Sequence, residues 1–196
     1  MSRDRPDGGV AAVLGESAAT KRRLADDTET IDLIERVGIE LAETLERGDR
    51  VVLFGNGGSA ADAQHVAAEL SGRFRRDREP LPAIAVTANS SAVTAIANDY
   101  GYETVFARQV RGIVTDGDAA VGISTSGRSA NVLRGLAAAD ERGATTVGLT
   151  GRDGGELPDV ADHTIRVPSA DTARIQEAHI AVGHVLCRIV EERLYE

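Results

Sequence analysis

The sequence predicts an α/β fold in which a doubly wound parallel sheet is flanked by helices, with further helices at the N-terminus. Three observations lead to this prediction. Short β-like runs alternate with helical segments along most of the chain. Most of these runs are continuously apolar, which is typical of strands buried on both faces of a parallel sheet. Two strand-to-helix junctions are rich in glycine or hydroxyl residues, as is common at the ligand-binding edge of such sheets.

The chain before the first predicted strand is expected to form an N-terminal helical segment over about residues 10–48. It contains two helices, of which the second is better defined. Apolar residues recur in this second helix at helical spacing, and Gly48 lies where a C-terminal cap belongs. These apolar residues are Ile31, Ile34, Val37, Leu41 and Leu45.

Strand-like and helix-like segments alternate after residue 50. The predicted strands span residues 51–54, 83–86, 119–124, 146–150 and 163–167. The predicted helices span residues 60–73, 91–96, 104–114, 130–142 and 173–194. Since neither an internal repeat nor a low-complexity linker interrupts this pattern, residues 1–196 are predicted to form a single domain.

Composition and charge narrow the classes of function. The 196 residues are 42% hydrophobic and 27% charged, which is ordinary for a globular protein. The net charge of −9 argues against nucleic acid as a partner, and no apolar run approaches the ~18 residues of a membrane helix. The N-terminus lacks the apolar stretch of a secretory signal, and Cys187 is the single cysteine, so we expect a cytoplasmic protein with no membrane partner.

Hydroxyl side chains are concentrated where the predicted strand at 119–124 meets the next helix. A helix start offers unpaired N–H groups and the positive end of its dipole, and hydroxyls donate to phosphate oxygens without adding charge. Ser129 could act only as a helix N-cap, but a cap explains one hydroxyl and not four. The junction is therefore predicted to bind phosphate. Its hydroxyl residues are Ser124, Thr125, Ser126 and Ser129.

A glycine-rich turn follows the first predicted strand. The string GNGGSA fits the permissive dinucleotide pattern through Gly55, Gly57 and Ala60. No acidic residue ends a second strand about twenty residues later, where a ribose would be bound, so this match is weak. The turn, with Asn56 and Gly58, is better interpreted as the second wall of a sugar-phosphate pocket.

The helix after this turn carries His65 and Glu69 at positions i and i+4, and hence on one face. Taken alone, such a pair is most often a surface feature. Two further segments change its interpretation. Asn98 and Asp99 follow an apolar helical stretch, and the last predicted helix carries Gln176 and His184.

Five blocks of the sequence together resemble the sugar isomerase (SIS) family. They are FGNGGSAADAQHVAAELSGRF, AIANDYGYETVF, ISTSGRSANV, LTGRDGGEL and RIQEAHIAVGHVL. The blocks are specific in this order, and the resemblance extends from about residue 30 to the end. It implies an SIS fold, a homotetramer and an isomerase that interconverts sedoheptulose 7-phosphate and D-glycero-D-manno-heptose 7-phosphate.

The resemblance also implies roles for individual residues. The catalytic glutamate falls on Glu69 and the catalytic histidine on His184. One zinc ion per subunit is implied, with His65, Glu69, Gln176 and His184 as its ligands. Substrate contacts are implied for Asn56, Gly57, Gly58, Glu69, Asn98, Asp99, Ser124, Thr125, Ser126, Ser129 and Gln176.

Two alternatives stay open at this stage. Some relatives resemble regulators that bind the replication initiator and lack the full catalytic set, whereas Glu69 and His184 are present here. An isomerase of another sugar phosphate is the second alternative, because Ala173 stands where some isomerases have Asp.

Aldose–ketose isomerisation moves a proton between C1 and C2 through an enediol. A glutamate suits the carbon-bound proton and a histidine suits the oxygen protons, so Glu69 is assigned as base and His184 as its acid/base partner. Zinc would polarise the carbonyl, but Glu69 cannot easily be both a tight zinc ligand and a free base.

The spacing of Gln176 and His184 raises a question of geometry. Eight residues on one helix separate them by ~12 Å along the axis. Two hypotheses account for a shared ion: the site is completed across a subunit interface, or the helix begins later than residue 173.

Overall fold

The computed structural model describes residues 9–195. Two helices, α1 (Gly9–Ala25) and α2 (Thr28–Glu46), precede the sheet. The sheet consists of β1 (Val51–Gly55), β2 (Ala83–Ala85), β3 (Ala119–Ile123), β4 (Thr145–Thr150) and β5 (His163–Arg166). The remaining helices are α3 (Gly58–Ser71), α4 (Ser90–Tyr100), α5 (Val105–Ile113), α6 (Ala130–Asp140) and α7 (Thr172–Tyr195), with the short 3₁₀ turns η1 (Tyr102–Thr104) and η2 (Leu157–Asp159).

All five strands are parallel and lie in the order β2-β1-β3-β4-β5. This order confirms the doubly wound fold, because β2 is added on one side of β1 and β3, β4 and β5 follow on the other side. Every residue of β1 and β3 is buried, which accounts for their continuously apolar sequences.

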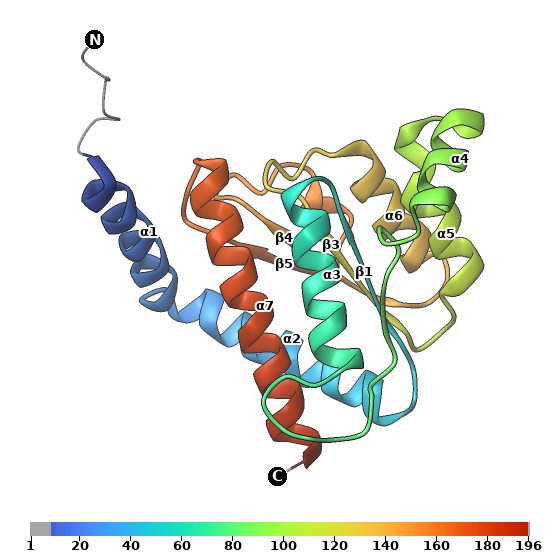
Figure 1. The fold of residues 1–196 in the computed structure, drawn as a ribbon, viewed down its shortest axis with the longest axis horizontal. Helices are drawn as coiled ribbons and strands as arrows, with labels where there is room; N and C mark the ends of the chain where they lie inside the picture. Colours follow the sequence, from blue (N-terminus) through green and yellow to red (C-terminus); the bar gives the residue numbers. More distant parts are fainter. Residues whose placement is uncertain (1–8, 196) are drawn as a thin grey trace.

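The sheet separates two apolar cores, and successive residues of β1 point into opposite ones. Val51 and Leu53 face the core beneath α2, α3 and α7, whereas Val52 and Phe54 face the core beneath α5 and α6. This alternation follows from the pleat of a strand, in which neighbouring side chains leave opposite faces. Figure 1 shows α3 and α7 side by side over one face, with α5 and α6 on the other side of the strands.

Several helix ends differ from the sequence prediction. The helix predicted at 91–96 extends over Ser90–Tyr100, because Asn89 caps its start and Gly101 ends it with φ 87°. The helix predicted at 60–73 begins earlier, at Gly58. Gly57, with φ 56°, makes the tight turn between β1 and this helix that a residue with a Cβ would adopt less easily.

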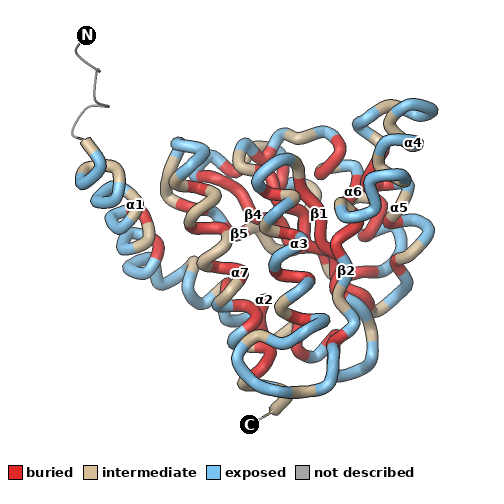
Figure 2. Tube along the Cα trace, viewed as in Figure 1, coloured by how far each residue is buried: buried red, intermediate tan, exposed pale blue. Residues whose placement is uncertain are grey.

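The two N-terminal helices confirm that the segment before β1 is helical. Helix α1 projects from the body of the molecule and is mostly exposed in Figure 2. Its apolar residues Val10 and Leu14 are 77% and 65% exposed. Among residues 9–195, no helix is both long and apolar enough to cross a membrane.

Candidate active site

The hydroxyl-rich loop lies at the carboxyl end of β3, as the sequence predicts. The Ser124 hydroxyl is buried, and its oxygen lies 2.9 Å from the Ser129 hydroxyl and 3.5 Å from the Ser126 hydroxyl. Ser129 occupies the N-cap position of α6, yet its side chain makes no capping hydrogen bond. The hydroxyls therefore gather beside the N–H groups of a helix start, which is an arrangement suited to an anion.

A second loop, residues 151–156, packs against the hydroxyl-rich loop. Gly127 has φ 65°, and a Cβ at this position would overlap the carbonyl oxygen of Gly154. The Glu156 N–H donates to the Gly127 carbonyl at 2.8 Å, and the Gly151 N–H donates to that of Thr125 at 3.1 Å. This contact explains two glycines of the LTGRDGGEL block, because a Cβ on Gly151 would lie 2.8 Å from the Thr125 carbonyl oxygen and a Cβ on Gly155 would lie 2.5 Å from that of Gly127.

The glycine turn is tied to the hydroxyl loop by a pair of amides. Asn56 and Asn131 exchange two hydrogen bonds of 2.8 Å, so the end of β1 is joined to the first turn of α6. The Tyr102 hydroxyl donates to the side-chain amide oxygen (Oδ1) of Asn56 at 3.0 Å. Asn131 is 4% exposed. The sequence did not predict its pairing with Asn56, because it shows only a polar residue at the start of an apolar helix.

The other implied substrate residues on this side lie on α4. Asn98 and Asp99 are exposed, and the Asn98 amide donates to the Asp99 carboxylate at 2.8 Å. Helix α4 packs on α5 and η1 but buries none of its residues. The two side chains are thus presented at the surface rather than enclosed in the chain.

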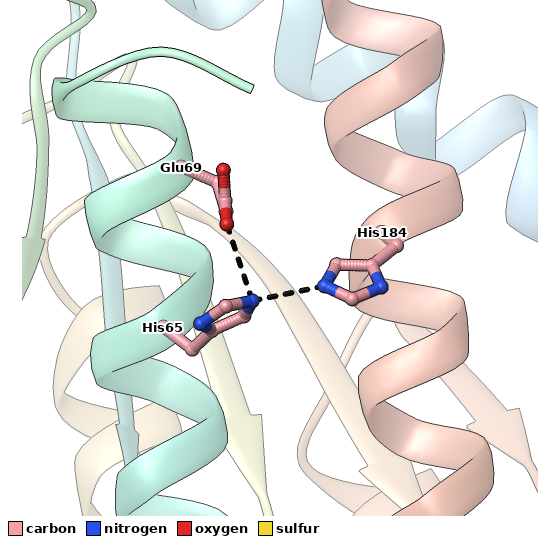
Figure 3. Close-up of side chains that lie close together, drawn as sticks. All are labelled: His65, Glu69 and His184. Carbon is pink, nitrogen blue, oxygen red and sulfur yellow. Dashed lines mark hydrogen bonds and ion pairs between the residues drawn. The ribbon is translucent and has the colours of Figure 1, made fainter. Parts of the chain in front are cut away.

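Three of the four implied metal ligands meet between α3 and α7. Figure 3 shows the His65 ring between Glu69, on its own helix, and His184 on α7. The two Nε2 atoms lie 2.9 Å apart, and His65 Nε2 lies 3.2 Å from a Glu69 carboxylate oxygen. Within residues 9–195, this is the one group of His, Cys, Asp or Glu side chains that could hold a metal ion, with its ligand atoms within 4.8 Å of one another.

The donor set fits zinc. Imidazole nitrogen and carboxylate oxygen are ordinary zinc ligands, and three protein ligands with an open position form the usual catalytic zinc site. The Glu69 side chain is 23% exposed and that of His65 46% exposed, so a small molecule can reach the cluster from solvent.

Close packing of α3 on α7 brings these residues together. Gly183 precedes His184, and a Cβ on it would lie 2.6 Å from the Cγ2 of Val66, which follows His65. A real Cβ does not approach a methyl carbon this closely, so either the Val66 side chain or one of the two helices would have to shift. The lack of a side chain at Gly183 therefore allows α3 and α7 to pack closely beside the two imidazoles.

Gln176, the fourth implied metal ligand, lies away from the cluster of His65, Glu69 and His184. Helix α7 is continuous from Thr172, and the Asp171 carboxylate caps it by accepting from the Ala173 N–H at 2.9 Å. The hypothesis that this helix begins later than residue 173 is therefore wrong. The Gln176 amide covers the start of α3, where a Cβ on Gly58 would lie 2.5 Å from its Nε2. Within one chain, Gln176 thus lies ~12 Å along α7 from His184.

The buried side chains of His179 and Cys187 stay uncharged near neutral pH. Burial lowers the pKa of His179 to about 4, against a weaker opposing effect of its 3.2 Å contact with the Thr150 carbonyl, so the ring is neutral and packed in the core. Burial, assisted by the Glu69 carboxylate, raises the pKa of Cys187 to about 12, which leaves an unreactive thiol.

Comparisons with known proteins agree with this architecture. The SIS domain family matches residues 16–151. The phosphoheptose isomerase of Aquifex aeolicus is 52% identical over 187 residues, which cover 95% of this chain and 97% of that protein. That of Nitratiruptor is 57% identical over 150 residues, covering 76% and 80%.

Solved structures of two such isomerases share the fold. Phosphoheptose isomerase GmhA from Neisseria gonorrhoeae has a TM-score of 0.85 at 42% identity, covering 93% of this chain and 97% of that one. The isomerase from Francisella tularensis has a TM-score of 0.87 at 34% identity, covering 93% and 96%.

The fold and its two loops define a doubly wound α/β protein with an anion-type loop at the carboxyl edge of its sheet. This chain belongs to the SIS domain family, as its sequence resemblance indicated.

Proposed function

We propose that the chain is an aldose–ketose isomerase that converts sedoheptulose 7-phosphate into D-glycero-D-manno-heptose 7-phosphate through an enediol. The observation that carries this proposal is the cluster of His65, Glu69 and His184 on two neighbouring helices. Its support from relatives is broad, because the similar phosphoheptose isomerases cover nearly the whole chain.

Within this proposal the two ends of the site have separate tasks. The hydroxyl loop holds the phosphate, and this remote binding energy fixes the reacting carbons. The glycine turn at Gly58 and the cluster at His65 are seven residues apart on α3, ~10 Å along its axis, so a substrate that spans both favours a long, open-chain sugar phosphate.

Glu69 is the base that moves the proton between C1 and C2. Its side chain is 23% exposed, so the carboxylate is partly removed from solvent, and Figure 3 shows it directed toward His65. His184 exchanges protons with the substrate oxygens, because an imidazole both donates and accepts near neutral pH.

Zinc is proposed as the cofactor, one ion per subunit. His65, Glu69 and His184 would hold it, and Gln176 is the fourth proposed ligand. A bound zinc ion supplies Lewis acidity that polarises the substrate carbonyl. The second oxygen of the Glu69 carboxylate is available for the proton in that case.

We further propose a homotetramer in which neighbouring subunits complete the site. The separation of Gln176 from His184 and the exposure of Asn98 and Asp99 on α4 support this arrangement. So does an apolar groove of about 380 Å³ between α1, α2 and α7, which the exposed apolar residues of another α1 could fill. The groove is lined by Lys21, Leu24, Ala25, Ile31, Ile34, Glu35, Ala181, Val182, Val185 and Ile189.

The proposed enzyme is one SIS domain in the cytoplasm. Helix α7 lies beyond the matched residues 16–151, but it packs against α2 and α3 as part of the same core. The lone cysteine is buried, which is consistent with a reducing compartment.

An isomerase of another sugar phosphate is a second candidate, favoured by Ala173. This residue is exposed and supplies no polar side-chain group at a position where some isomerases have an aspartate. A non-catalytic regulator is disfavoured, since Glu69 and His184 are both present and adjoin His65.

A coupled assay with a panel of five- to seven-carbon ketose phosphates tests the proposal, with and without a zinc chelator. We expect the fastest turnover with sedoheptulose 7-phosphate and a loss of rate with chelator. Faster turnover of a shorter ketose phosphate would select the second candidate, and no turnover of any sugar would exclude the isomerase.

A further inference from the structure

The segment between α3 and β2, residues 72–82, is irregular, yet a single carboxylate on α7 binds its backbone. Glu191 on α7 is 2% exposed. Its oxygens accept from the backbone N–H groups of Phe74 at 3.1 Å, Arg75 at 3.0 Å and Arg76 at 3.3 Å. Burial raises the pKa of the Glu191 carboxyl, but these N–H donors and the Arg78 guanidinium outweigh it, so the pKa lies below its usual value.

Arg78 joins this carboxylate to the end of α3. Its side chain is 1% exposed, and Nε donates to Glu191 at 3.1 Å. The terminal nitrogens donate to the carbonyl oxygens of Glu69 at 2.9 Å and Leu70 at 2.8 Å. These carbonyls are among the groups that the last turn of a helix leaves unpaired, so the guanidinium caps α3 at the residue proposed as the base.

The anchored segment delivers an aromatic ring to the other proposed catalytic residue. The Phe74 ring stacks on the His184 imidazole, with centroids 5.6 Å apart and an interplanar angle of 29°. The His65 ring contacts the same imidazole edge-on at 5.1 Å. His184 therefore contacts two rings, one stacked and one edge-on.

We propose that Phe74 is a positioning residue for His184, and that Glu191 and Arg78 hold it there. This inference rests on the proposed function, in which His184 is the acid/base partner of Glu69. His184 and Glu191 are seven residues apart on α7 and so share one face of that helix. The same carboxylate thus fixes the ring that stacks on His184, while Arg78 fixes the helix end that carries Glu69.

A stacked ring restricts the rotation of the imidazole, and orientation is a large part of catalytic rate. A displacement of about 1 Å at a reacting group can cost roughly 100-fold in rate. Outer partners of metal ligands contribute about 10- to 100-fold to affinity or activity. A mere packing role for Phe74 would change the stability of the fold but not the rate of the folded enzyme.

The test compares Phe74→Leu with Phe74→Tyr in the full chain. The leucine removes the ring, and we expect kcat to fall about 10- to 100-fold with KM nearly unchanged, because the phosphate end is intact. The affinity for Zn²⁺ alone, measured by chelator competition, should fall by a similar factor. The tyrosine keeps the ring and should restore both values.

Two further measurements separate this inference from the proposed function. The NMR signals of the His184 ring protons should shift in Phe74→Leu and return in Phe74→Tyr, whether or not the protein turns over any sugar. In Glu191→Gln, the amide hydrogens of Phe74, Arg75 and Arg76 should exchange faster. Glu192→Gln is the matched control, since the Glu192 side chain is 38% exposed and its carboxylate pairs with Arg188 at 2.6 Å on the surface of α7.

The inference is overturned if Phe74→Leu keeps wild-type Zn²⁺ affinity and unshifted His184 signals. It is overturned equally if Phe74→Tyr fails to restore what the leucine removes. Should Glu191→Gln not fold, the two Phe74 variants decide the question alone. An inactive wild type would reject the proposed isomerase while leaving the Zn²⁺ and NMR comparison valid.

Discussion

The two ends of the candidate site differ in the groups that form them and in the contacts that fix those groups. The phosphate end is made of backbone and short side chains at the edge of the sheet, where a second loop packs directly against Gly127. The reactive end is made of long side chains on two helices, brought together by a close approach at Gly183. Binding groups can thus be fixed by local loop geometry, whereas reacting groups depend on how whole helices pack.

The largest expected effect is at the reactive end. Glu69→Gln removes the proposed base but keeps the shape of the side chain, so we expect turnover to fall roughly 10²- to 10⁴-fold. Sugar-phosphate binding, measured by calorimetry, should be largely retained because the hydroxyl loop is distant. Glu43→Gln, a change at an exposed position of α2, should keep full activity. Wild-type turnover in Glu69→Gln would exclude this residue as the base.

The next effect is at the phosphate end. Gly127→Ala places a Cβ at positive φ and into the Gly154 carbonyl, so we expect a loss of about 2–5 kcal/mol in the free energy of unfolding, with a raised KM. Gly48→Ala is the matched control. Gly48 also has positive φ, but a Cβ there meets nothing within 4 Å. Equal destabilisation of both variants in urea would show that the contact with Gly154 has no energetic weight.

A smaller change tests the approach of the two helices. In Gly183→Ala the added methyl group pushes α7 away from Val66, and we expect a destabilisation of about 1–3 kcal/mol with weaker Zn²⁺ binding. The control Gly112→Ala has free space around it and should be neutral or stabilising by about 1 kcal/mol. Unchanged Zn²⁺ affinity in Gly183→Ala would separate the metal cluster from this packing contact.

The smallest expected stability change is that of a variant at Ser129, the proposed phosphate ligand. The Ser129 hydroxyl makes no capping bond, but it lies 2.9 Å from the buried Ser124 hydroxyl, so Ser129→Ala should lower the free energy of unfolding by about 0.5–1.5 kcal/mol while raising KM about tenfold or more. Asn89→Ala is the comparison, because the Asn89 side chain does cap α4 at 3.1 Å, and its loss should cost about 1 kcal/mol. An unchanged KM in Ser129→Ala would exclude Ser129 as a phosphate ligand.

The sequence predicted the position of the hydroxyl loop better than the meeting of His65, Glu69 and His184, for a physical reason. Buried parallel strands and helix starts have local signatures, so the order of elements and the position of Ser124–Ser129 could be expected from the chain alone. His65 and Glu69 gave a local signal, but their meeting with His184 depends on Gly183, a glycine with no special backbone angle. Phe74, Arg78, Glu191 and Asn131 lack a local pattern because their partners lie on other elements.

The packing of α7 on α3 also has a consequence for synthesis of the protein. The histidines that meet are 119 residues apart, and α7 follows β1, α3 and β3 along the chain. Synthesis runs from the N-terminus onward, so the segments of β1, β3 and the hydroxyl loop leave the ribosome before α7 does. Helix α7 also contributes to the core beneath β1 and β3, so that core is incomplete until α7 has been made. The cluster of His65, Glu69 and His184 can therefore form only after α7 has been synthesised.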